Sequence, residues 1–128
     1  MHLLSDGTKP IYVQIAEWIE TEILNGNFQP NDKVYSQYKL AEIFTINPAT
    51  AAKGLNLLSD EKILYSKRGL GKFVTQEARQ LILSKRKNHT LRKLLDEVAL
   101  EATRLQVKEE ELQDMLRESV QKIKGEAK

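Results

Sequence analysis

The sequence predicts a mainly α fold (α+β), in which three helices precede a small β-hairpin and two further helices follow it. Three observations carry this prediction. Apolar residues recur at helical spacing in five segments of the 128-residue chain. Two strand-like stretches, ILYSK and KFVT, flank the glycine-containing sequence RGLG. Asn-Gly and Asn-Pro pairs interrupt the helical pattern at positions where a helix would end or begin.

Composition favours a soluble globular protein and excludes several other classes. Hydrophobic residues make up 41% and charged residues 30% of the chain, which is unlike a disordered sequence. The longest uncharged run, residues 43–52, is shorter than the roughly 18 residues that a membrane helix needs. Residues 1–10 lack the basic and apolar regions of a signal peptide. Because cysteine is absent and the two histidines are isolated, we expect a cytoplasmic protein without a metal or cofactor.

The first two helices are bounded by local signals. Pro10 is expected at the first helical position, followed by apolar residues at helical spacing: Ile11, Ile15, Trp18, Ile19 and Ile23. Asn25-Gly26-Asn27 supplies a left-handed C-cap. After a turn at Pro30-Asn31 and a short strand over residues 33–35, Ser36 is expected to cap the second helix. That helix carries Leu40, Ala41, Ile43 and Phe44.

The third helix is expected to begin with few large side chains and to end near Asp60. Asn47 is the predicted N-cap and Pro48 the first helical residue, after a tight turn over residues 45–47. Small residues occupy the first turn: Ala49, Ala51 and Ala52. They permit the close approach of DNA or of a neighbouring helix. Thr50 and Lys53 are expected on the outward face, opposite Leu55 and Leu58.

A winged helix-turn-helix has this order of elements: a helix, a short turn, a second helix and a hairpin. The second helix of the helix-turn-helix motif enters the DNA major groove. In the hairpin, Gly69 and Gly71 would let the backbone approach a groove closely. Arg68 would enter a narrow minor groove, and Lys67 and Lys72 would contact phosphates. Each residue taken alone also fits a plain structural role, as a cap, a solvated lysine or a tight turn. Their order along the chain favours the DNA-binding interpretation.

Residues 10–74 resemble the winged-helix domain of GntR-family transcriptional regulators. PIYVQIA, ILNGNFQPNDKV, LAEIF and KRGLGKFV match the family's signatures in order. INPATAAKGLNLL is most similar to the short YtrA-type subfamily, which carries a small two-helix tail. The resemblance implies DNA contacts from the second helix, the third helix and the hairpin, at Ser36, Tyr38, Lys39, Asn47, Pro48, Ala49, Thr50, Lys53, Lys67, Arg68, Gly69, Gly71 and Lys72.

The chain departs from the family pattern at several positions. Tyr38, Pro48 and Ala52 stand where relatives commonly have arginine, so the family's commonest scheme of base contacts is not expected here. Lys53 is the remaining cation of the third helix and is expected to contact a base edge or a nearby phosphate. Thr45 replaces a frequent glycine in the turn.

A tail is expected over residues 77–128, after a DNA-binding domain over residues 1–76. Residues 106–108 are predicted to separate two helices, and the acidic residues 109–111 suit the N-terminus of the second. The basic run over residues 85–93 is expected to be mostly a solvated face. Two amphipathic helices need a further surface for their apolar faces. Packing against the winged domain is one solution, and the favoured one is a homodimer through Leu91, Leu94, Leu95, Val98, Ala102, Leu105, Leu112, Leu116 and Ile123.

These features predict a regulator that binds double-stranded DNA as a homodimer at a pseudo-palindromic operator. The resemblance implies repression of the regulator's own operon, which in YtrA-type relatives often encodes an ABC transporter. The alternative is a winged-helix interaction module without operator specificity. The sequence shows no catalytic nucleophile with a general base, no paired carboxylates in a plausible cleft and no phosphate-binding loop. No enzymatic activity is therefore expected. No membrane contact is expected, and the sequence does not identify an effector.

Overall fold

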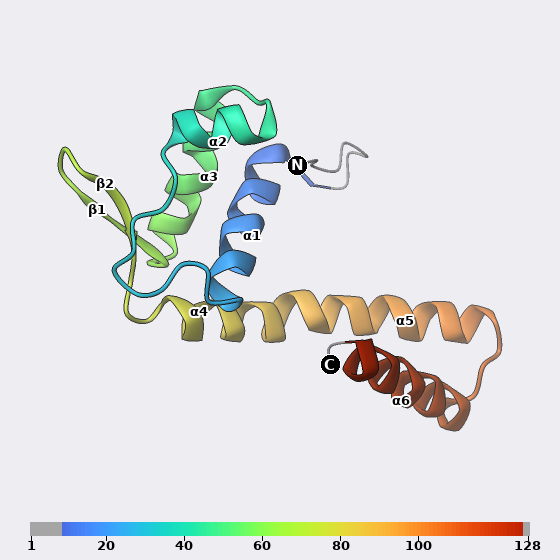
Figure 1. Ribbon diagram of the computed structural model, residues 1–128. Coiled ribbons are helices and arrows are strands. Elements are labelled where there is room, and N and C mark those ends of the chain that lie inside the picture. Colours follow the sequence, from blue (N-terminus) through green and yellow to red (C-terminus); the bar gives the residue numbers. More distant parts are fainter. Residues whose placement is uncertain (1–8, 127–128) are drawn as a thin grey trace. The chain divides into compact units, whose positions relative to one another are not determined.

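The computed structural model describes residues 9–126. The expectation that there is no signal peptide concerns residues 1–10 and so lies almost entirely outside this range. The chain forms two compact units, one ending at Lys85 and one beginning at Arg86. Each is described by itself. The first unit contains α1 (Ile11–Leu24), α2 (Gln37–Phe44), α3 (Pro48–Asp60), β1 (Leu64–Lys67), β2 (Gly71–Val74) and α4 (Ala78–Lys85) (Figure 1).

The mainly α prediction is confirmed, with one antiparallel hairpin as its β part. Helix α1 begins one residue later than expected, because Pro10 lies in the N-cap position with an extended ψ of 149°. At its other end Gly26 adopts the predicted left-handed conformation, with a φ of +83°. Asn25 and Asn27 donate hydrogen bonds from their backbone N–H groups to carbonyls of the last turn. The Asn-Gly-Asn sequence therefore ends the helix.

The turn between α2 and α3 depends on a left-handed residue that is not glycine. Ser36 caps α2 as expected, accepting a hydrogen bond from the backbone N–H of Lys39 at 3.1 Å. Thr45 then takes a φ of +55° and a ψ of +56° and ends that helix. A β-branched residue is uncommon in this conformation, so the turn is held by its surroundings. Ile46 contributes by donating its backbone N–H to Ala41.

The hairpin pairs Leu64 with Val74 at one end and Lys67 with Gly71 at the other. The expected strand over residues 33–35 is reduced to a single bridge between Lys33 and Phe73. The backbone N–H of Val34 donates to the carbonyl of Lys72 at 3.0 Å and extends this attachment. The segment before α2 is therefore joined to the wing by backbone hydrogen bonds.

The first unit extends beyond residue 76, where the sequence placed the end of the DNA-binding domain. Ala78 and Ile82 on α4 are buried in the same core as Ile15, Ile19 and Leu58. Arg79 also donates from its Nη1 to the carbonyl of Leu24 at 2.6 Å. Sequence periodicity missed α4 because only two of its eight residues face the core. The compact unit is thus completed by a helix that had been expected to belong to the tail.

A buried carboxylate joins α1 to α4. Glu20 is only 1% exposed, and the Lys85 ammonium donates hydrogen bonds to its carboxylate and to Glu61 at the end of α3, the latter at 3.0 Å. Burial lowers the pKa of Lys85, but the hydrogen bonds to Glu20 and Glu61 outweigh it, so this pKa lies above its ordinary value of 10.5. The ammonium therefore stays charged and compensates the buried acid.

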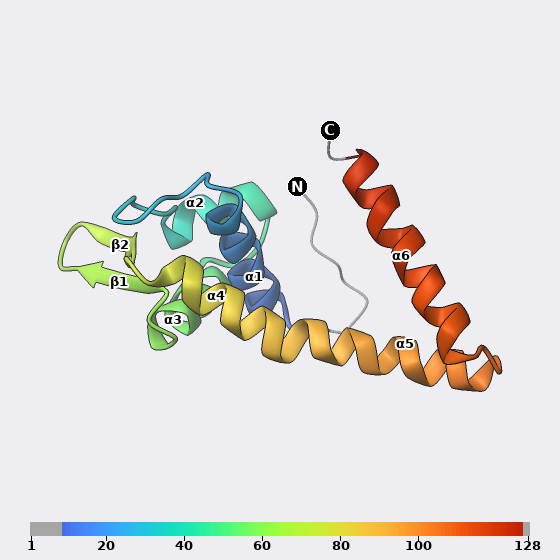
Figure 2. The same cartoon turned by 90° about the horizontal axis from the view of Figure 1, so that it is seen from below.

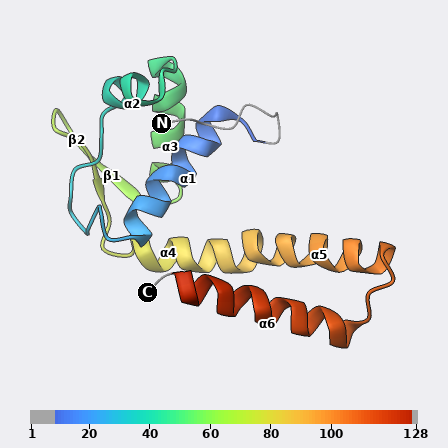
Figure 3. The same cartoon turned by 45° about the vertical axis from the view of Figure 1, so that its right-hand side comes forward.

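The second unit contains the π-helix η1 (Arg86–Leu91), α5 (Arg92–Arg104) and α6 (Glu109–Glu126). Gln106, with a φ of +59°, lies in the predicted break between the last two helices. Glu109, Glu110 and Glu111 occupy the first turn of α6, as expected. The two helices are antiparallel and lie on the same side of the connecting turn (Figure 3). Figure 2 shows that the distance between them widens away from the turn. Neither helix therefore covers the other along its length.

The ion cluster of Glu20, Glu61 and Lys85 predicts a pH-dependent contribution to stability. Lys85→Met removes the ammonium that donates to the buried Glu20 carboxylate. We expect a cost of about 2–4 kcal/mol, toward the lower end of the range for breaking a buried ion pair, because the Lys85 side chain is 32% exposed. A lysine whose pKa is raised stabilises fully below 10.5, and this contribution is lost as the pH rises through its higher folded value. The difference in free energy of unfolding between wild type and variant should therefore shrink above about pH 10.5.

Chemical denaturation between pH 7 and 11 measures this difference. Lys39→Met is the matched control, because Lys39 pairs with Glu42 on the surface at 3.8 Å. That pair should contribute no more than about 1 kcal/mol at any pH. An equal effect of the two substitutions at pH 7 would contradict the assignment of Lys85 as the partner of a buried acid.

Candidate nucleic-acid interface

Helix α3 presents a face of small and polar side chains because its opposite face is packed into the core. Ala51, Gly54, Leu55 and Leu58 are buried. Gly54 comes so close to α1 that a Cβ at this position would lie 2.8 Å from the carbonyl oxygen of Tyr12. The absence of a side chain at Gly54 thus allows the two helices to touch. This contact determines which residues of α3 face outward.

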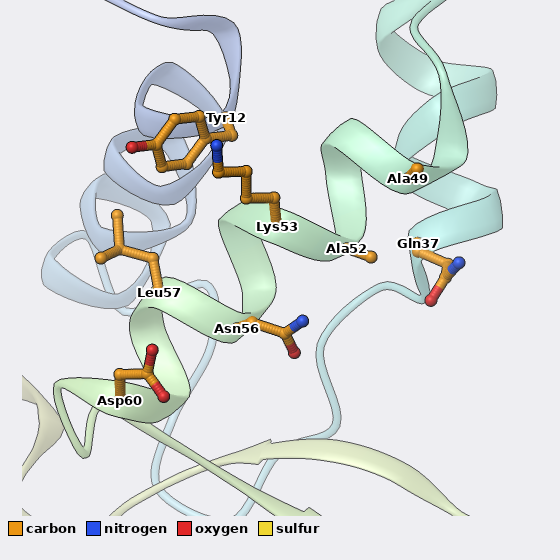
Figure 4. A pocket seen from close by; sticks show the side chains of 8 residues that line it. All are labelled: Tyr12, Gln37, Ala49, Ala52, Lys53, Asn56, Leu57 and Asp60. Atoms are coloured by element: carbon orange, nitrogen blue, oxygen red, sulfur yellow. The ribbon is translucent and has the colours of Figure 1, made fainter.

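The outward face of α3 borders a groove of about 510 Å³, called here the α3 groove. Tyr12 contributes from α1 and Gln37 from the first turn of α2 (Figure 4). The remaining lining residues lie on α3: Ala49, Ala52, Lys53, Asn56, Leu57 and Asp60. Thr50, expected on this face beside Lys53, is half-buried and does not line the groove. The position of Lys53 on the outward face agrees with the helical spacing.

The start of α3 has the predicted cap. The side-chain Oδ1 of Asn47 accepts a hydrogen bond from the backbone N–H of Ala49 at 2.7 Å, and Pro48 is the first helical residue. Asn47 remains exposed. Its oxygen is therefore engaged within the protein, which leaves its amide NH₂ as the group available to a phosphate or base.

Lys53 is held by an aromatic ring. Its ammonium lies 4.1 Å from the centroid of the Tyr12 ring, a distance at which a cation and a ring face attract each other. Figure 4 shows the lysine chain extending toward α1, while Asn56 points to the other side of the groove. The cation thus sits at the α1 border of the groove. Spacing along α3 could not predict this, because Tyr12 belongs to another helix.

A second groove, of about 280 Å³, separates the start of α2 from the hairpin and is called here the wing groove. It brings together residues predicted from separate motifs, namely Ser36, Tyr38, Gly71 and Lys72. Lys33, Tyr35 and Leu70 also line it. Gln37 lines both grooves, so the start of α2 connects the α3 face to the wing. Lys39 lies nearby in sequence and pairs with Glu42 at the surface.

The cations of the hairpin have different surroundings. Lys72 donates from its Nζ to the hydroxyls of Ser59 and Ser66, at 2.9 and 3.0 Å, and so links β2 to α3 and β1. The Lys67 ammonium lies 4.5 Å from the centroid of the Phe73 ring. Arg68 is exposed beside Gly69 in the turn, and it has no side-chain hydrogen bond or ion pair within residues 9–126. Arg68 is therefore the hairpin cation most available to an external anion.

The two hairpin glycines satisfy different needs. Gly69 has a φ of +78° and faces open space, so its role is the backbone conformation of the turn. Gly71 has a φ of +114°, and a Cβ there would lie 3.0 Å from the Cε atom of Lys33. Lys33 thus packs across the strand at a point where no side chain is present.

Sequence reasoning missed three polar residues of these grooves. Asn56 follows Lys53 by three residues, so the helical spacing could have identified it. Gln37 and Lys33 gave no such signal, because their placement depends on how the segment before α2 meets α3 and the hairpin. Within the described residues, no group of histidines, cysteines and acids could hold a metal ion. The search of the same residues found no helix suited to crossing a membrane.

The tail residues predicted to form a dimer interface lie mainly on α5 and α6. Leu95, Val98, Leu112 and Leu116 line a groove of about 390 Å³ between these helices. Ala102 is buried. The other predicted residues are exposed outside that groove: Leu91, Leu94, Leu105 and Ile123. Large apolar side chains therefore remain uncovered within the second unit.

Comparison with known proteins identifies relatives of this architecture. The profile of "Bacterial regulatory proteins, gntR family" matches residues 11–74. The transcriptional repressor NagR of Bacillus subtilis is 37% identical over 76 residues, which cover 59% of this chain but 31% of NagR. The repressor YtrA of the same organism is 29% identical over 116 residues, which cover 91% of this chain and 88% of YtrA. The chain thus spans about a third of NagR but most of YtrA.

Solved structures give the same picture. A GntR family transcriptional regulator from Listeria monocytogenes is 30% identical and matches with a TM-score of 0.72, over 88% of this chain and 97% of that one. The DNA-binding domain of AraR in complex with operator ORX1 is 30% identical and has a TM-score of 0.54, over 59% of this chain and 95% of that one. The winged helix-turn-helix prediction is confirmed by these matches, and the relatives are named regulators rather than enzymes.

The contact of α3 with α1 predicts that Gly54→Ala destabilises the first unit. The added methyl group would meet the backbone oxygen of Tyr12 and also the Cγ2 of Ile15 at 3.1 Å, so one helix must shift. Alanine favours a helix by about 1 kcal/mol over glycine, but overpacking typically costs about 1–3 kcal/mol. We expect a net loss, measured by thermal unfolding. Gly125→Ala, in a helix with nothing within 4 Å of the added group, is the control and should cause no loss.

Proposed function

The chain belongs to the GntR family of bacterial regulatory proteins, and from this premise we propose that it is a sequence-specific DNA-binding transcriptional regulator that acts as a homodimer and represses its own operon. The observation that carries the proposal is that the α3 groove and the wing groove adjoin, since Gln37 lines both. One continuous surface therefore presents the start of α2, the outward face of α3 and the hairpin. A winged helix-turn-helix contacts DNA with these elements.

The side chains of this surface suit a duplex. Ala49 and Ala52 leave the first two turns of α3 slim enough to enter a major groove. Arg68 at the tip of the hairpin is exposed and suits the negative potential of a narrow minor groove. Lys53 lies at the border of the α3 groove, where a phosphate would pass, and we therefore assign it to a phosphate contact. The relatives support the same function, because two of them are named as repressors and one was solved in complex with operator DNA.

The homodimer is proposed from the apolar surface of the second unit. Eight large apolar side chains of α5 and α6 are each at least 41% exposed: Leu94, Leu95, Val98, Leu100, Met115, Leu116, Val120 and Ile123. A surface of this kind is costly in water, and a second copy with the same surface could cover it around a twofold axis. Two DNA-binding units related by that axis would read a pseudo-palindromic operator with half-sites about one helical turn apart.

The target of repression is proposed from the likeness to YtrA. This chain covers most of YtrA, and the short YtrA-type resemblance implies control of the regulator's own operon, with the genes of an ABC transporter within it. Binding of the purified chain to the promoter region of its own operon, in the presence of excess competitor DNA, tests this proposal. Binding that competitor DNA abolishes would favour an interaction module without operator specificity.

The phosphate assignment of Lys53 predicts how DNA binding responds to salt. Lys53→Ala should weaken operator and scrambled duplexes by the same factor and lower the slope of log K against log salt by about 0.9, the effect of one phosphate contact. Binding of both duplexes over a series of salt concentrations measures it. Lys122→Ala, an exposed lysine of α6, is the matched control and should change neither quantity. A loss confined to the operator would show that Lys53 contacts a base instead.

The dimer proposal predicts that charge on the α5 and α6 surface dissociates the chain. Leu95→Glu combined with Leu116→Glu should convert a dimer into a monomer at micromolar concentration in sedimentation and weaken operator binding. Leu83→Glu is a matched control, because Leu83 on α4 is 48% exposed and Leu95 is 47% exposed. Sedimentation of the unchanged chain as a monomer would contradict the proposal.

Truncation offers a second test, with its cut placed by the core. Removal of residues 77–128 would also remove Ala78, Ile82 and Lys85, which complete the first unit. A chain ending at Lys85 should instead keep the cooperative unfolding of the first unit and sediment as a monomer. A chain ending at residue 76 should unfold at a lower temperature.

A further inference from the structure

The α3 groove holds two side-chain amides that the assignments above leave without a role. Asn56 lies on α3 and Gln37 on the first turn of α2, and both line this groove. Figure 4 shows the two amides on the same side of α3, with Ala52 between them and Lys53 directed away toward Tyr12. Two different helices thus place the same chemical group at one surface.

Both amides are available to a ligand. Asn56 is exposed and Gln37 is half-buried. Among the residues that the structure describes, neither side chain has a hydrogen-bond partner. Asn47, by contrast, uses its oxygen to cap α3. Asn56 and Gln37 can therefore offer an acceptor oxygen and a donor NH₂ at the same time.

The chemistry of this groove matches one kind of base pair. An amide that donates and accepts together is complementary to the N7 acceptor and N6 donor of adenine in the major groove. The methyl groups of Ala49 and Ala52, which lie on the same face, suit contact with the C5-methyl group of thymine. Guanine is usually read by a cation. Lys53, the only cation among the described residues that line this groove, is placed over the Tyr12 ring. Asp60, near the end of α3, repels phosphate, so the duplex is expected nearer to Ala49.

We propose that Asn56 and Gln37 are specificity-determining residues that each recognise an adenine, so that the half-site under α3 consists of A·T base pairs contacted by the two amides and by Ala49 and Ala52. The inference rests on the proposed function, since it requires sequence-specific DNA binding. It assigns base recognition to residues outside the set predicted from the sequence. It leaves Lys53 to the phosphate backbone.

The experiment begins with selection of duplexes from a randomised pool by the full-length chain. Selected half-sites should contain A·T pairs at the positions under α3. In a selected duplex, 7-deazaadenine removes only the N7 acceptor, and uracil in place of thymine removes only the methyl group. Each adenine replacement at a recognised position should weaken binding by the wild-type chain about 5- to 150-fold, because the amide NH₂ is left desolvated without its N7 acceptor. Because the protein is unchanged, this result does not depend on the folding of a variant.

Variants then assign each position to a residue. Asn56→Ala should lose discrimination at one base pair and become insensitive to 7-deazaadenine there, while Gln37→Ala should do the same at a different base pair. Gln80→Ala is the matched control, an exposed amide on α4 that lines neither groove, and it should behave as wild type.

Three outcomes would overturn the inference. Selected half-sites with G·C pairs at every position under α3 would refute recognition of adenine. An equal loss for all duplexes in Asn56→Ala and Gln37→Ala would identify phosphate contacts. Insensitivity of the wild-type chain to every 7-deazaadenine would exclude the amide contacts to N7. Failure of the pool to yield any preferred duplex is distinct from these, because it would refute the proposed function itself and the inference with it.

Discussion

The close packing of α3 against α1 at Gly54 is the constraint on which the candidate interface depends. With no Cβ at this position, the backbone of α3 rests directly on Tyr12 and Ile15. That contact fixes the rotation of α3 about its own axis, so Ala51, Leu55 and Leu58 enter the core. The residues on the opposite side of α3 then face outward. A helix held further from α1 by a side chain would present a different set of residues to a ligand.

The first unit itself provides partners for two cations near α3. Lys53 adjoins Gly54 in sequence, so the close approach of α1 brings the Tyr12 ring within reach of its ammonium. Lys72 is drawn to Ser59 near the other end of α3 and to Ser66 in the hairpin. Two of the basic side chains around α3 are thus oriented by the protein itself. A positioned cation loses less conformational freedom when a phosphate binds.

The two compact units have contrasting surfaces that suit separate tasks. The first unit buries its apolar residues around α1. The ion cluster of Glu20, Glu61 and Lys85 joins α1 and the end of α3 to α4. Its α3 groove is lined mainly by small, polar and charged side chains. The second unit begins directly after Lys85 and keeps its large apolar side chains exposed. The surface suited to DNA and the surface suited to another protein chain thus lie on different parts of the sequence.

Sequence alone determined the features that arise within a few residues. The cap at Asn47 and Pro48, the end of α1 at Gly26 and the break near Gln106 were predicted, because their hydrogen bonds and backbone angles involve only near neighbours in the chain. The winged helix-turn-helix followed from the order of its helices and hairpin. For the candidate site, spacing placed Lys53 on the outward face but could not show which atoms it touches.

Only the tertiary structure decided features that join residues far apart in sequence. The pairing of the buried Glu20 with Lys85 joins two different helices, and the inclusion of α4 in the first unit depends on two core residues, Ala78 and Ile82. Thr45 takes the left-handed conformation although its side chain disfavours it, because packing on both sides of the turn outweighs the local preference. Likewise Gln37 and Asn56 meet at one groove because α2 and α3 fold together. Periodicity reports on one element at a time, whereas such contacts are set by how elements pack.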